Sequence, residues 1–370
     1  MQAGSIKGLR VAIDARMAFH TGIGRYIRSL TRELARREGE LALSLLGAPQ
    51  GHGESWLGDA PVTRVDFDAD IYSVKEQWVG SWLCRRLAGE TSVFHFPHYN
   101  VPWLAPSRTA VTIHDLTHLQ FPEFFPRGRV RLAYRVLRHA VRRASRLIAV
   151  SAATRSALER LMPEARGKTT VIHHGVDPAF RPVAEAEVEA FRRGQNLNRF
   201  VLYVGANKPH KNLAALTEAF RQVRAGSQRT ELVMICGSGE TPPADEPGVR
   251  VLPAASDEEL VLWYNAAQAV ALPSLNEGFG MPALESMACG TPVVGSDIPA
   301  LREVIGEAGL LVDVTDTAGL ALAIERILGD DDLRAELRDL ALARAATFSW
   351  TRAADETLQV YRQLAARHPA

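Results

Sequence analysis

The stretch Pro273–Asp297, PSLNEGFGMPALESMACGTPVVGSD, decides the fold of this chain. It follows a short apolar run, Ala269–Leu272, which predicts a buried strand. Gly278 and Gly280 punctuate the loop after that strand, since glycine adopts backbone angles that other residues avoid. Pro282 suits the first turn of the helix that comes next. A succession of strand, loop, helix and strand is typical of a parallel α/β sheet.

Two carboxylates lie eight residues apart in this stretch: Glu277 in the loop and Glu285, which the pattern places in the first turn of the helix. Backbone N–H groups at a helix start can hold an anion, and carboxylates accept hydrogen bonds from hydroxyls. This combination suits a sugar nucleotide. For Glu285 a structural role is the alternative, because an early-helix glutamate contributes about 0.3–1 kcal/mol through the helix dipole. For Glu277 the neighbouring glycine and loop position favour binding.

The segment Glu277-Gly-Phe-Gly-Met-Pro-Ala-Leu-Glu285 resembles the Glu-x7-Glu motif of retaining glycosyltransferases of family 4. The resemblance extends over nearly the whole chain. It implies the GT-B fold, in which two Rossmann-like, doubly wound α/β domains face each other across a cleft and a C-terminal helix packs back on the N-terminal domain. The motif is specific for the superfamily and poor at naming substrates.

Length and composition agree with two globular domains. The chain has 370 residues, 46% apolar and 23% charged, which exceeds one ordinary core. No apolar run reaches the ~18 residues of a membrane span, and the N-terminus lacks the pattern of a signal peptide. Three scattered cysteines, Cys84, Cys236 and Cys289, suggest neither disulfides nor zinc. We expect a cytoplasmic protein that can lie peripherally on the inner face of the cell membrane.

Charge divides the chain unequally. Residues 1–180 hold 25 Lys and Arg against 16 Asp and Glu, whereas residues 181–370 hold 18 against 26. Turns that contain glycine and proline, together with the resemblance, divide the chain into four predicted parts. These are an acceptor-binding domain at 1–178, a linker at 179–198, an NDP-sugar-binding domain at 199–346, and a helix at 347–370 that crosses back to the N-terminal domain.

The opening of the chain carries a second motif. Ile-Asp14-Ala-Arg, followed by Thr-Gly22-Ile-Gly24-Arg-Tyr, resembles bacterial family-4 enzymes that are often mannosyltransferases. The resemblance places Gly22 and Gly24 beside the donor diphosphate and favours GDP-mannose, with UDP-sugars next. A plain turn remains the alternative, because a lone Gly-x-Gly is weak evidence.

Several polar residues follow apolar runs, at the carboxyl ends of predicted strands where α/β sheets bind ligands. Asp14, His98 and Tyr99 are predicted to bind the acceptor. His114 resembles the histidine that family members place near the reacting sugar. His95 lies within its apolar run and is expected to be a satisfied core residue.

The predicted second domain opens with Gly205-Ala-Asn-Lys-Pro-His-Lys211, which resembles the phosphate loop of the family. Ala206 stands where an arginine is usual, and Lys208 or His210 could replace it. Lys211 is expected to neutralise the departing diphosphate, since charge-assisted contacts are about twice as strong as neutral ones. The remaining residues predicted to bind the donor are Gly205, Gly237, Leu252, Gly278, Phe279, Gly280 and Met281.

The resemblance implies transfer with retention of configuration. Glu277 would orient sugar hydroxyls, Glu285 would accept from the ribose diol, and His114 would hydrogen-bond the donor sugar. We expect no metal, and no cofactor besides the NDP-sugar co-substrate. The alternatives are an epimerase or phosphorylase on the same fold and a non-catalytic binding protein.

A basic segment lacks acidic balance: nine arginines and no carboxylate occur between Phe124 and Leu158. The spacing predicts a helix with a basic stripe, opposite an apolar face that includes Tyr134. Because exposed helices usually mix charge signs, we expect the stripe to dock on an anionic membrane. A solvated face is the alternative, and the lack of stacking aromatics argues against nucleic acid. The stripe comprises Arg127, Arg131, Arg135, Arg138, Arg142 and Arg146.

Overall fold

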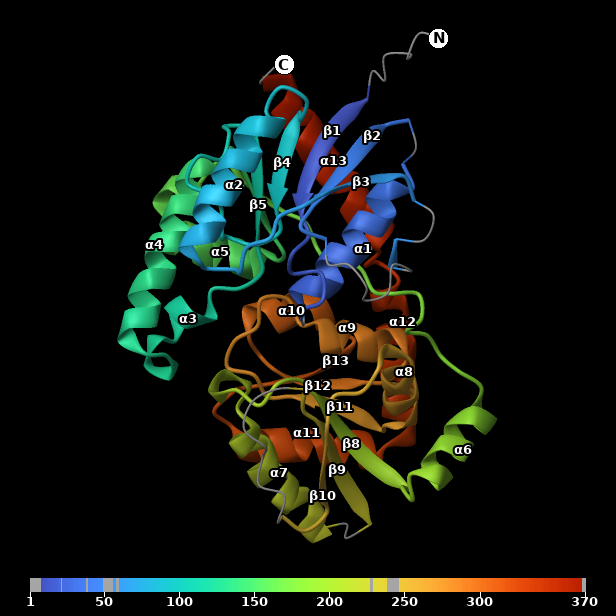
Figure 1. Ribbon diagram of the computed structural model, residues 1–370. Coiled ribbons are helices and arrows are strands. Elements are labelled where there is room, and N and C mark those ends of the chain that lie inside the picture. Colours follow the sequence, from blue (N-terminus) through green and yellow to red (C-terminus); the bar gives the residue numbers. More distant parts are fainter. Residues whose placement is uncertain are drawn as a thin grey trace. The chain divides into compact units, whose positions relative to one another are not determined.

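The structure is a computed structural model that describes residues 8–20, 22–37, 39–48, 56–57, 60–226, 229–237 and 246–367. It divides into two compact units. The first unit comprises Met1–Gly175 and Ser349–Ala370, and the second comprises Val176–Phe348. Each unit is built around a parallel sheet with helices on both faces, so both are Rossmann-like, as predicted (Figure 1).

In the described part of the first unit, seven strands form one parallel sheet in the order β3-β2-β1-β4-β5-β6-β7. The strands are β1 (Leu9–Asp14), β2 (Leu41–Leu46), β3 (Val62–Val65), β4 (Val93–Phe96), β5 (Thr109–Ile113), β6 (Arg146–Ala149) and β7 (Thr169–Val171). The central strands β4 and β5 are buried throughout, as expected where helices cover both faces. Alternate residues therefore supply two core clusters: Val11 and Ile13 face one layer, and Ala12 faces the other.

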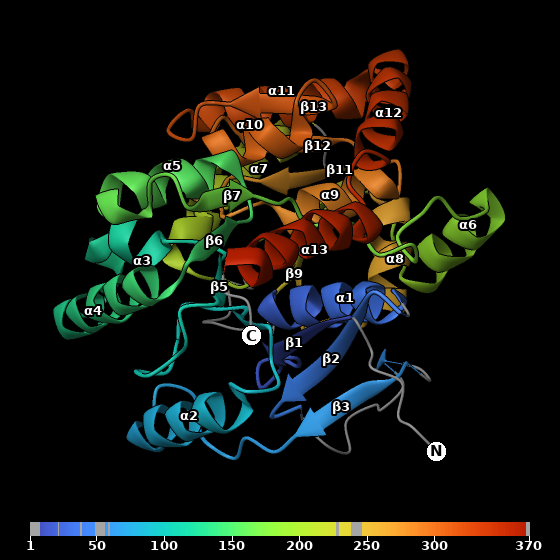
Figure 2. The same cartoon turned by 90° about the horizontal axis from the view of Figure 1, so that it is seen from above.

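Helices α1 (Ile23–Ala35) and α13 (Trp350–Arg367) cover the face that contains Val11, and they pack side by side (Figure 2). The opposite cluster receives side chains from α2 (Val74–Leu87), α4 (Arg127–Arg143) and α5 (Ala152–Leu161). Ser73 and Ser151 cap α2 and α5 by accepting backbone hydrogen bonds, each worth about 1 kcal/mol. The short helices are α3 (Thr117–Gln120), η2 (Pro122–Phe124) and η3 (Pro163–Ala165).

Helix α13 belongs to the first unit although it follows the second in the chain. Its Tyr361 is fully buried, and the Tyr361 hydroxyl lies 2.6 Å from Nδ1 of His95. The other ring nitrogen of His95 lies 2.8 Å from the Thr112 hydroxyl. His95 is therefore a satisfied core residue, as predicted, and it ties the C-terminal helix to β4 and β5.

In the described part of the second unit, six strands form a parallel sheet in the order β10-β9-β8-β11-β12-β13. The strands are β8 (Arg199–Val204), β9 (Thr230–Ile235), β10 (Val249–Leu252), β11 (Ala269–Leu272), β12 (Val293–Ser296) and β13 (Gly309–Val312). The helices are α6 (Glu185–Gly194), η4 (Pro209–Lys211), α7 (Leu213–Gly226), α8 (Asp257–Ala266), α9 (Met281–Ala288), α10 (Pro299–Ile305), α11 (Thr317–Gly329) and α12 (Asp331–Ala345).

The segment expected to be a linker, 179–198, contains α6. This helix packs on α8 of the second unit, where the rings of Phe191 and Trp263 meet edge to face at 4.9 Å. Helix α8 begins with a capping box: the Ser256 hydroxyl and the Glu259 side chain each accept a backbone hydrogen bond of the other residue.

Both sheets reverse their strand order at one place. The reversal lies between β1 and β4 in the first sheet, and between β8 and β11 in the second. At such a point successive connections leave toward opposite faces, so a crevice opens at the carboxyl ends of the two strands. Asp14 and Pro97 border this point in the first unit, and Gly205 and Pro273 border it in the second. Several predicted site residues lie at these two places, among them Asp14, Gly205 and Glu277.

The basic helix differs from the prediction at two positions. Arg146 does not extend the stripe, because Ala144 adopts an extended backbone and Arg146 begins β6. Tyr134 is 40% exposed and does not join an apolar face, because the buried residues of α4 lie in its second half, at Leu137, Ala140 and Val141. The other five arginines of the predicted stripe are exposed on α4.

No helix in the described part of the chain combines the length and the apolar character that crossing a bilayer requires.

Candidate functional site

The loop between β11 and α9 has the local structure that its sequence predicts. Gly280 caps α9 in the left-handed region with φ 108°, where a side chain would be strained and would also clash with Leu301. Pro282 lies in the first turn of the helix, and Gly290, with φ 78°, follows its end. The glycines thus permit the backbone angles of this segment, and Pro282 restricts the start of the helix.

Glu277 and Lys211 meet at the strand reversal of the second sheet. Lys211 Nζ lies 2.7 Å from Glu277 Oε1, and both side chains are mostly buried. The Ser274 hydroxyl donates to the same Glu277 oxygen at 2.7 Å. Backbone bonding joins the two loops as well, because the Leu275 amide donates to the His210 carbonyl. The result is a paired cation and carboxylate, fixed at the carboxyl ends of β8 and β11.

Glu285 does not lie in the first turn of α9, as the sequence pattern suggested, but in its second turn. Its side chain is buried, and the Tyr264 hydroxyl donates to its Oε2 at 2.9 Å. A stabilising interaction with the helix dipole fades beyond the first turn, so it does not explain this glutamate. A carboxylate buried at this depth is costly unless it is hydrogen-bonded, which is the role that Tyr264 fills.

Three predicted donor-binding residues lie at the neighbouring strand ends. Gly205 follows β8, and its amide donates to the Ile235 carbonyl at 3.0 Å. A side chain on Gly205 would meet the Tyr203 hydroxyl, whose pKa is raised by burial and by the Glu277 carboxylate. Gly237 and Leu252 stand at the ends of β9 and β10, which pair with each other. These residues form a row along one edge of the sheet.

In the loop between β11 and α9, which carries Glu277, the side chain of Phe279 is used for packing. The Phe279 ring is buried against Phe348, with ring centroids 5.8 Å apart, so it serves the core of the second unit. Gly278 and Met281 are half-buried on either side of it. If Phe279 contacts the donor as predicted, its packed ring leaves only its main chain for that contact.

His114 follows β5 in the first unit and is held on several sides. Its Nε2 donates to the Pro97 carbonyl at 2.8 Å, so the neutral ring carries its proton there. The ring stacks on His174 at 5.5 Å and meets the edge of Tyr26 at 4.9 Å. Burial lowers the pKa of His114 to about 4. At neutral pH its Nδ1 is therefore an acceptor, which suits a hydrogen bond from a sugar hydroxyl.

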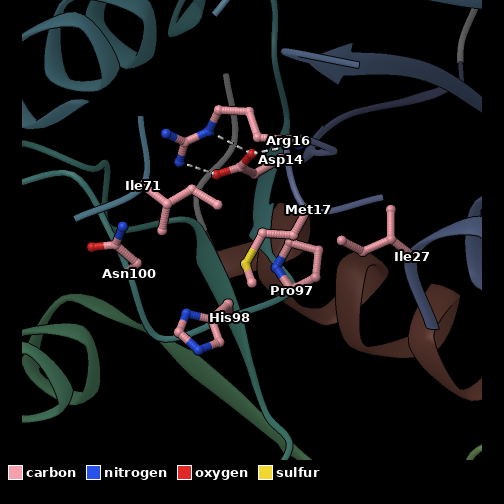
Figure 3. A pocket seen from close by; sticks show the side chains of 8 residues that line it. All are labelled: Asp14, Arg16, Met17, Ile27, Ile71, Pro97, His98 and Asn100. Carbon is pink, nitrogen blue, oxygen red and sulfur yellow. Dashed lines mark hydrogen bonds and ion pairs between the residues drawn. The ribbon is translucent and has the colours of Figure 1, made fainter. Parts of the chain in front are cut away.

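A pocket opens at the strand reversal of the first sheet (Figure 3). Asp14 and Arg16 form its polar wall: Nη2 of Arg16 lies 2.6 Å from Asp14 Oδ2, and Nε lies 2.9 Å from Oδ1. His98 lies across from them, and burial lowers its pKa to about 3. The remaining lining residues are Met17, Ile27, Ile71, Pro97 and Asn100.

Arg16 is fixed from its other side by Glu76, a fully buried residue of α2. The distance between Arg16 Nη2 and Glu76 Oε1 is 2.5 Å, and the Asn100 amide donates to Glu76 Oε2. The guanidinium also lies 3.8 Å above the Phe67 ring. A buried ionic network of this kind contributes little net stability but costs several kcal/mol to break, so it orients the pocket wall.

The other predicted residues of the first unit lie nearby. Tyr99 packs its ring on His98 at 4.1 Å. Gly22, with φ 32°, caps α1 and is exposed. Gly24 is buried, and a side chain there would clash with the Ala18 carbonyl, so close packing already requires glycine at this position.

Four residues that contact the predicted site residues were not predicted from the sequence: Arg16, Ser274, Tyr264 and Glu76. Arg16 carried a signal in the Asp-x-Arg spacing, and Ser274 follows its strand directly. Tyr264 and Glu76 carried none, because each reaches its partner, Glu285 or Arg16, from a helix distant in sequence. Among the described residues, no three His, Cys, Asp or Glu side chains gather in a way that could hold a metal ion.

Two family descriptions match the chain. Glycosyltransferase Family 4 matches residues 20–180, and Glycosyl transferases group 1 matches residues 198–330. Similar curated proteins include the O-antigen chain mannosyltransferase B of Escherichia coli, 28% identical over 93% of this chain and 96% of that protein. A D-inositol 3-phosphate glycosyltransferase of Thermobispora bispora is 33% identical over 74% of this chain and 71% of that protein.

The fold has solved counterparts. Sucrose-phosphate synthase from Thermosynechococcus elongatus superposes with a TM-score of 0.77 at 22% identity, covering 97% of this chain and 100% of that one.

Proposed function

The chain belongs to glycosyltransferase family 4, and from this premise we propose that it transfers a mannosyl group, with retention and without a metal, from GDP-mannose to a glycan or lipid-linked acceptor. That it is a glycosyltransferase that uses a nucleotide-sugar donor follows from the family. The identities of the nucleotide base, the transferred sugar and the acceptor are what we propose beyond it. Synthesis of cell-envelope polysaccharide or glycolipid is the setting that we infer for it.

The observation that carries the donor assignment is the 2.7 Å contact between Lys211 and Glu277 at the strand reversal of the second sheet. A nucleoside diphosphate needs a cation near its phosphates, and Lys211 supplies one that is already desolvated and held. Preorganised charge of this kind stabilises the negative charge that grows on the departing diphosphate. Glu277 then orients the sugar hydroxyls, and buried Glu285 accepts from the ribose diol.

His114 supports the retaining reaction as a hydrogen-bond acceptor. Because its ring is neutral and Nε2 is committed to Pro97, the acceptor atom Nδ1 is the one available to a sugar hydroxyl. A proton-donating role at neutral pH would require a pKa near 7. We therefore assign His114 to orientation of the donor sugar and not to acid catalysis.

The pocket of the first unit is the proposed acceptor site. Asp14 forms an ion pair with Arg16, and its oxygens can accept hydrogen bonds from sugar hydroxyls. His98, Asn100 and the apolar wall of Met17 and Ile71 complete a surface that is polar on one side only. This amphipathic lining suits the two faces of a pyranose ring.

GDP-mannose is favoured by two observations. The opening motif resembles that of mannosyltransferases, and the Escherichia coli relative, whose name is O-antigen chain mannosyltransferase B, matches this chain over almost its full length. The second relative acts on an inositol phosphate by its name, which is why a glycolipid acceptor belongs to the proposal.

A donor panel tests the proposal. The melting temperature should rise most with GDP-mannose, less with UDP-glucose or UDP-N-acetylglucosamine, because a ligand that binds only the folded state stabilises it by mass action. Release of GDP should then require an acceptor, which separates transfer from an epimerase or a phosphorylase. A larger shift with any UDP-sugar would refute the donor assignment and leave the family unchanged.

Peripheral membrane docking is also part of the proposal. The exposed face of α4 carries Arg127, Arg131 and Arg135 with no salt bridge among the described residues, whereas Arg138 and Arg142 lie 3.7 and 3.8 Å from Glu164. Arginines near an anionic leaflet contribute about 1 kcal/mol each. Partitioning onto phosphatidylglycerol but not phosphatidylcholine vesicles would support it, and equal partitioning onto both would refute it.

A further inference from the structure

Three of the six tryptophans of the chain are exposed, and all three lie on the first unit. Trp78 is 67% exposed, Trp82 56% and Trp103 49%, whereas the other three are almost completely buried. Tryptophan is among the most costly side chains to leave in water, since it offers about 150–250 Å² for burial. A gathering of exposed tryptophans therefore indicates a binding surface.

Helix α2 carries its apolar residues on the outer face. Val74, Trp78 and Trp82 follow each other at intervals of four, so they form one stripe along the helix, and all three are exposed. The inner face holds Glu76, which is engaged by Arg16, together with Gly80 and Ser81. The core of the first unit therefore does not use the stripe.

The segment after β4 extends the stripe sideways. Trp103 meets Trp78 edge to face at 6.2 Å, and Leu104 beside it is 54% exposed. The Leu104 amide donates to the Ser81 hydroxyl of α2 at 3.2 Å, so the segment is attached to that helix. We call Val74, Trp78, Trp82, Trp103 and Leu104 the tryptophan surface.

The same segment connects the tryptophan surface to the basic helix. His139 of α4 lies 3.4 Å from the Pro102 carbonyl, and Arg143 donates to the Ala105 carbonyl. Helices α2 and α4 contribute to one core cluster, and Figures 1 and 2 both place them on the same flank of the first sheet. The tryptophan surface and the exposed arginines of α4 thus belong to one side of the unit.

The charged residues beside the tryptophan surface indicate which kind of partner binds it. The exposed charged residues of α2 are Arg85, Arg86 and Lys75, and Lys75 is paired with the exposed Asp68 at 2.9 Å. The Arg86 guanidinium lies 5.2 Å from the centre of the Trp82 ring. Tryptophans bordered by arginines are typical of the bilayer interface, where the rings lie at headgroup depth and the cations contact anionic lipids. A sugar-binding platform would instead surround its aromatic rings with carboxylates and amides, which α2 does not expose.

We propose that the tryptophan surface inserts into the interfacial layer of an anionic bilayer and anchors the first unit there. The inference rests on the proposed membrane docking and deepens it: arginines of α4 attract the leaflet, and α2 lies in its surface with Trp78 and Trp82 at the boundary between the headgroups and the acyl chains. Docking by charge alone would be released by salt, whereas inserted tryptophans retain the protein.

The test uses the tryptophan fluorescence of the full chain with phosphatidylglycerol-rich vesicles. The buried tryptophans, Trp56, Trp263 and Trp350, already lie in apolar surroundings, so insertion of the exposed three should shift the emission to shorter wavelength. Lipids with brominated acyl chains should quench that emission. A variant that combines Trp78→Ser, Trp82→Ser and Trp103→Ser should partition about tenfold more weakly or worse, because binding scales with the apolar area inserted.

Leu322→Ser provides the matched control, since Leu322 is an equally exposed apolar residue of the second unit, at 59%, and should leave partitioning unchanged. Melting temperature and the shift induced by GDP-mannose establish that each variant is folded. Undiminished partitioning of the triple variant, together with its loss in Arg131→Glu/Arg135→Glu, would overturn tryptophan insertion and leave arginine docking intact. A blue shift without vesicles, accompanied by a doubled mass, would also overturn it by identifying a second copy as the occupant.

Discussion

Nζ of Lys211 and Oε1 of Glu277 lie 2.7 Å apart, although 66 residues separate them in the chain. The pair joins the loop after β8 to the loop after β11, at the place where the strand order of the second sheet reverses. Each charge keeps the other in position before a donor arrives. The cation therefore needs little reorganisation when charge develops on a leaving group, which is the condition for effective electrostatic catalysis.

Lys211→Ala is expected to lower kcat/KM about 10²-fold or more, because removal of one preorganised charge-stabilising group typically has an effect of that size. The free energy of unfolding should fall by about 1–3 kcal/mol, since Glu277 loses its cation and keeps the Ser274 hydrogen bond. Steady-state kinetics with varied donor and urea unfolding would measure both quantities.

Arg221→Ala is the control for lost positive charge in the second unit, because Arg221 is exposed and paired with Glu218 and Glu246 away from the strand reversal. It should leave kcat/KM unchanged. Wild-type turnover in Lys211→Ala would rule out the phosphate-neutralising role.

Glu285→Gln is expected to raise KM for the donor at least about tenfold, because the carboxylate proposed to accept from two ribose hydroxyls becomes an amide with one acceptor oxygen. Tyr264→Phe separates this role from packing. It removes the hydroxyl that donates to Glu285 and keeps the ring, so it should cost about 1 kcal/mol of stability and change KM less than Glu285→Gln does. Equal effects of the two variants on KM would indicate that Glu285 acts only through the fold.

Stability should depend on pH through the buried histidines. Burial lowers the pKa of His95 to about 3, below the value near 6.5 of an unfolded histidine. Between these values the unfolded chain binds more protons than the folded one, so the free energy of unfolding falls as the pH is lowered from 6.5 toward 3. The largest slope from one such histidine is about 1.36 kcal/mol per pH unit.

Urea unfolding between pH 7.5 and 4.5 would measure this slope. His95→Gln retains hydrogen-bonding groups for Tyr361 and Thr112 but removes the proton, so its stability should depend less steeply on pH. His20→Gln changes an exposed histidine and should follow the wild type. Parallel curves for the wild type and His95→Gln would contradict this explanation.

Transfer is expected to be insensitive to chelators. The cation that faces the proposed diphosphate position is Lys211, and the first turn of α9 adds backbone donors at the same strand reversal. Initial rates measured with excess EDTA should equal those measured with added Mg²⁺. Strong inhibition by EDTA, reversed by Mg²⁺, would require a metal-dependent mechanism.

Much of this architecture was predictable because local sequence specifies local structure. Strand β11 has the predicted bounds, Ala269–Leu272, since it is a run of apolar residues ended by the turn that begins at Pro273. The loop at Gly280 and the helix after it are likewise determined by backbone preferences of glycine and proline. The Glu-x7-Glu motif lies within this loop and helix, so Glu277 and Glu285 could be predicted as site residues from the motif alone. Lys211 could be predicted from the resemblance of its segment to the phosphate loop of the family.

Tertiary structure decided what those residues touch. Tyr264 reaches Glu285 from α8, and Glu76 reaches Arg16 from α2, so neither partner has a signature in the sequence near the site. Helix α2 is a second case in which the local sequence pattern does not determine the contacts. Its apolar stripe resembles a surface that faces a core. The stripe is nevertheless exposed, because Glu76, the buried partner of Arg16, lies on the opposite side of the helix. Periodicity reveals that a helix has two faces, whereas the neighbours that satisfy its buried polar groups determine which face points inward.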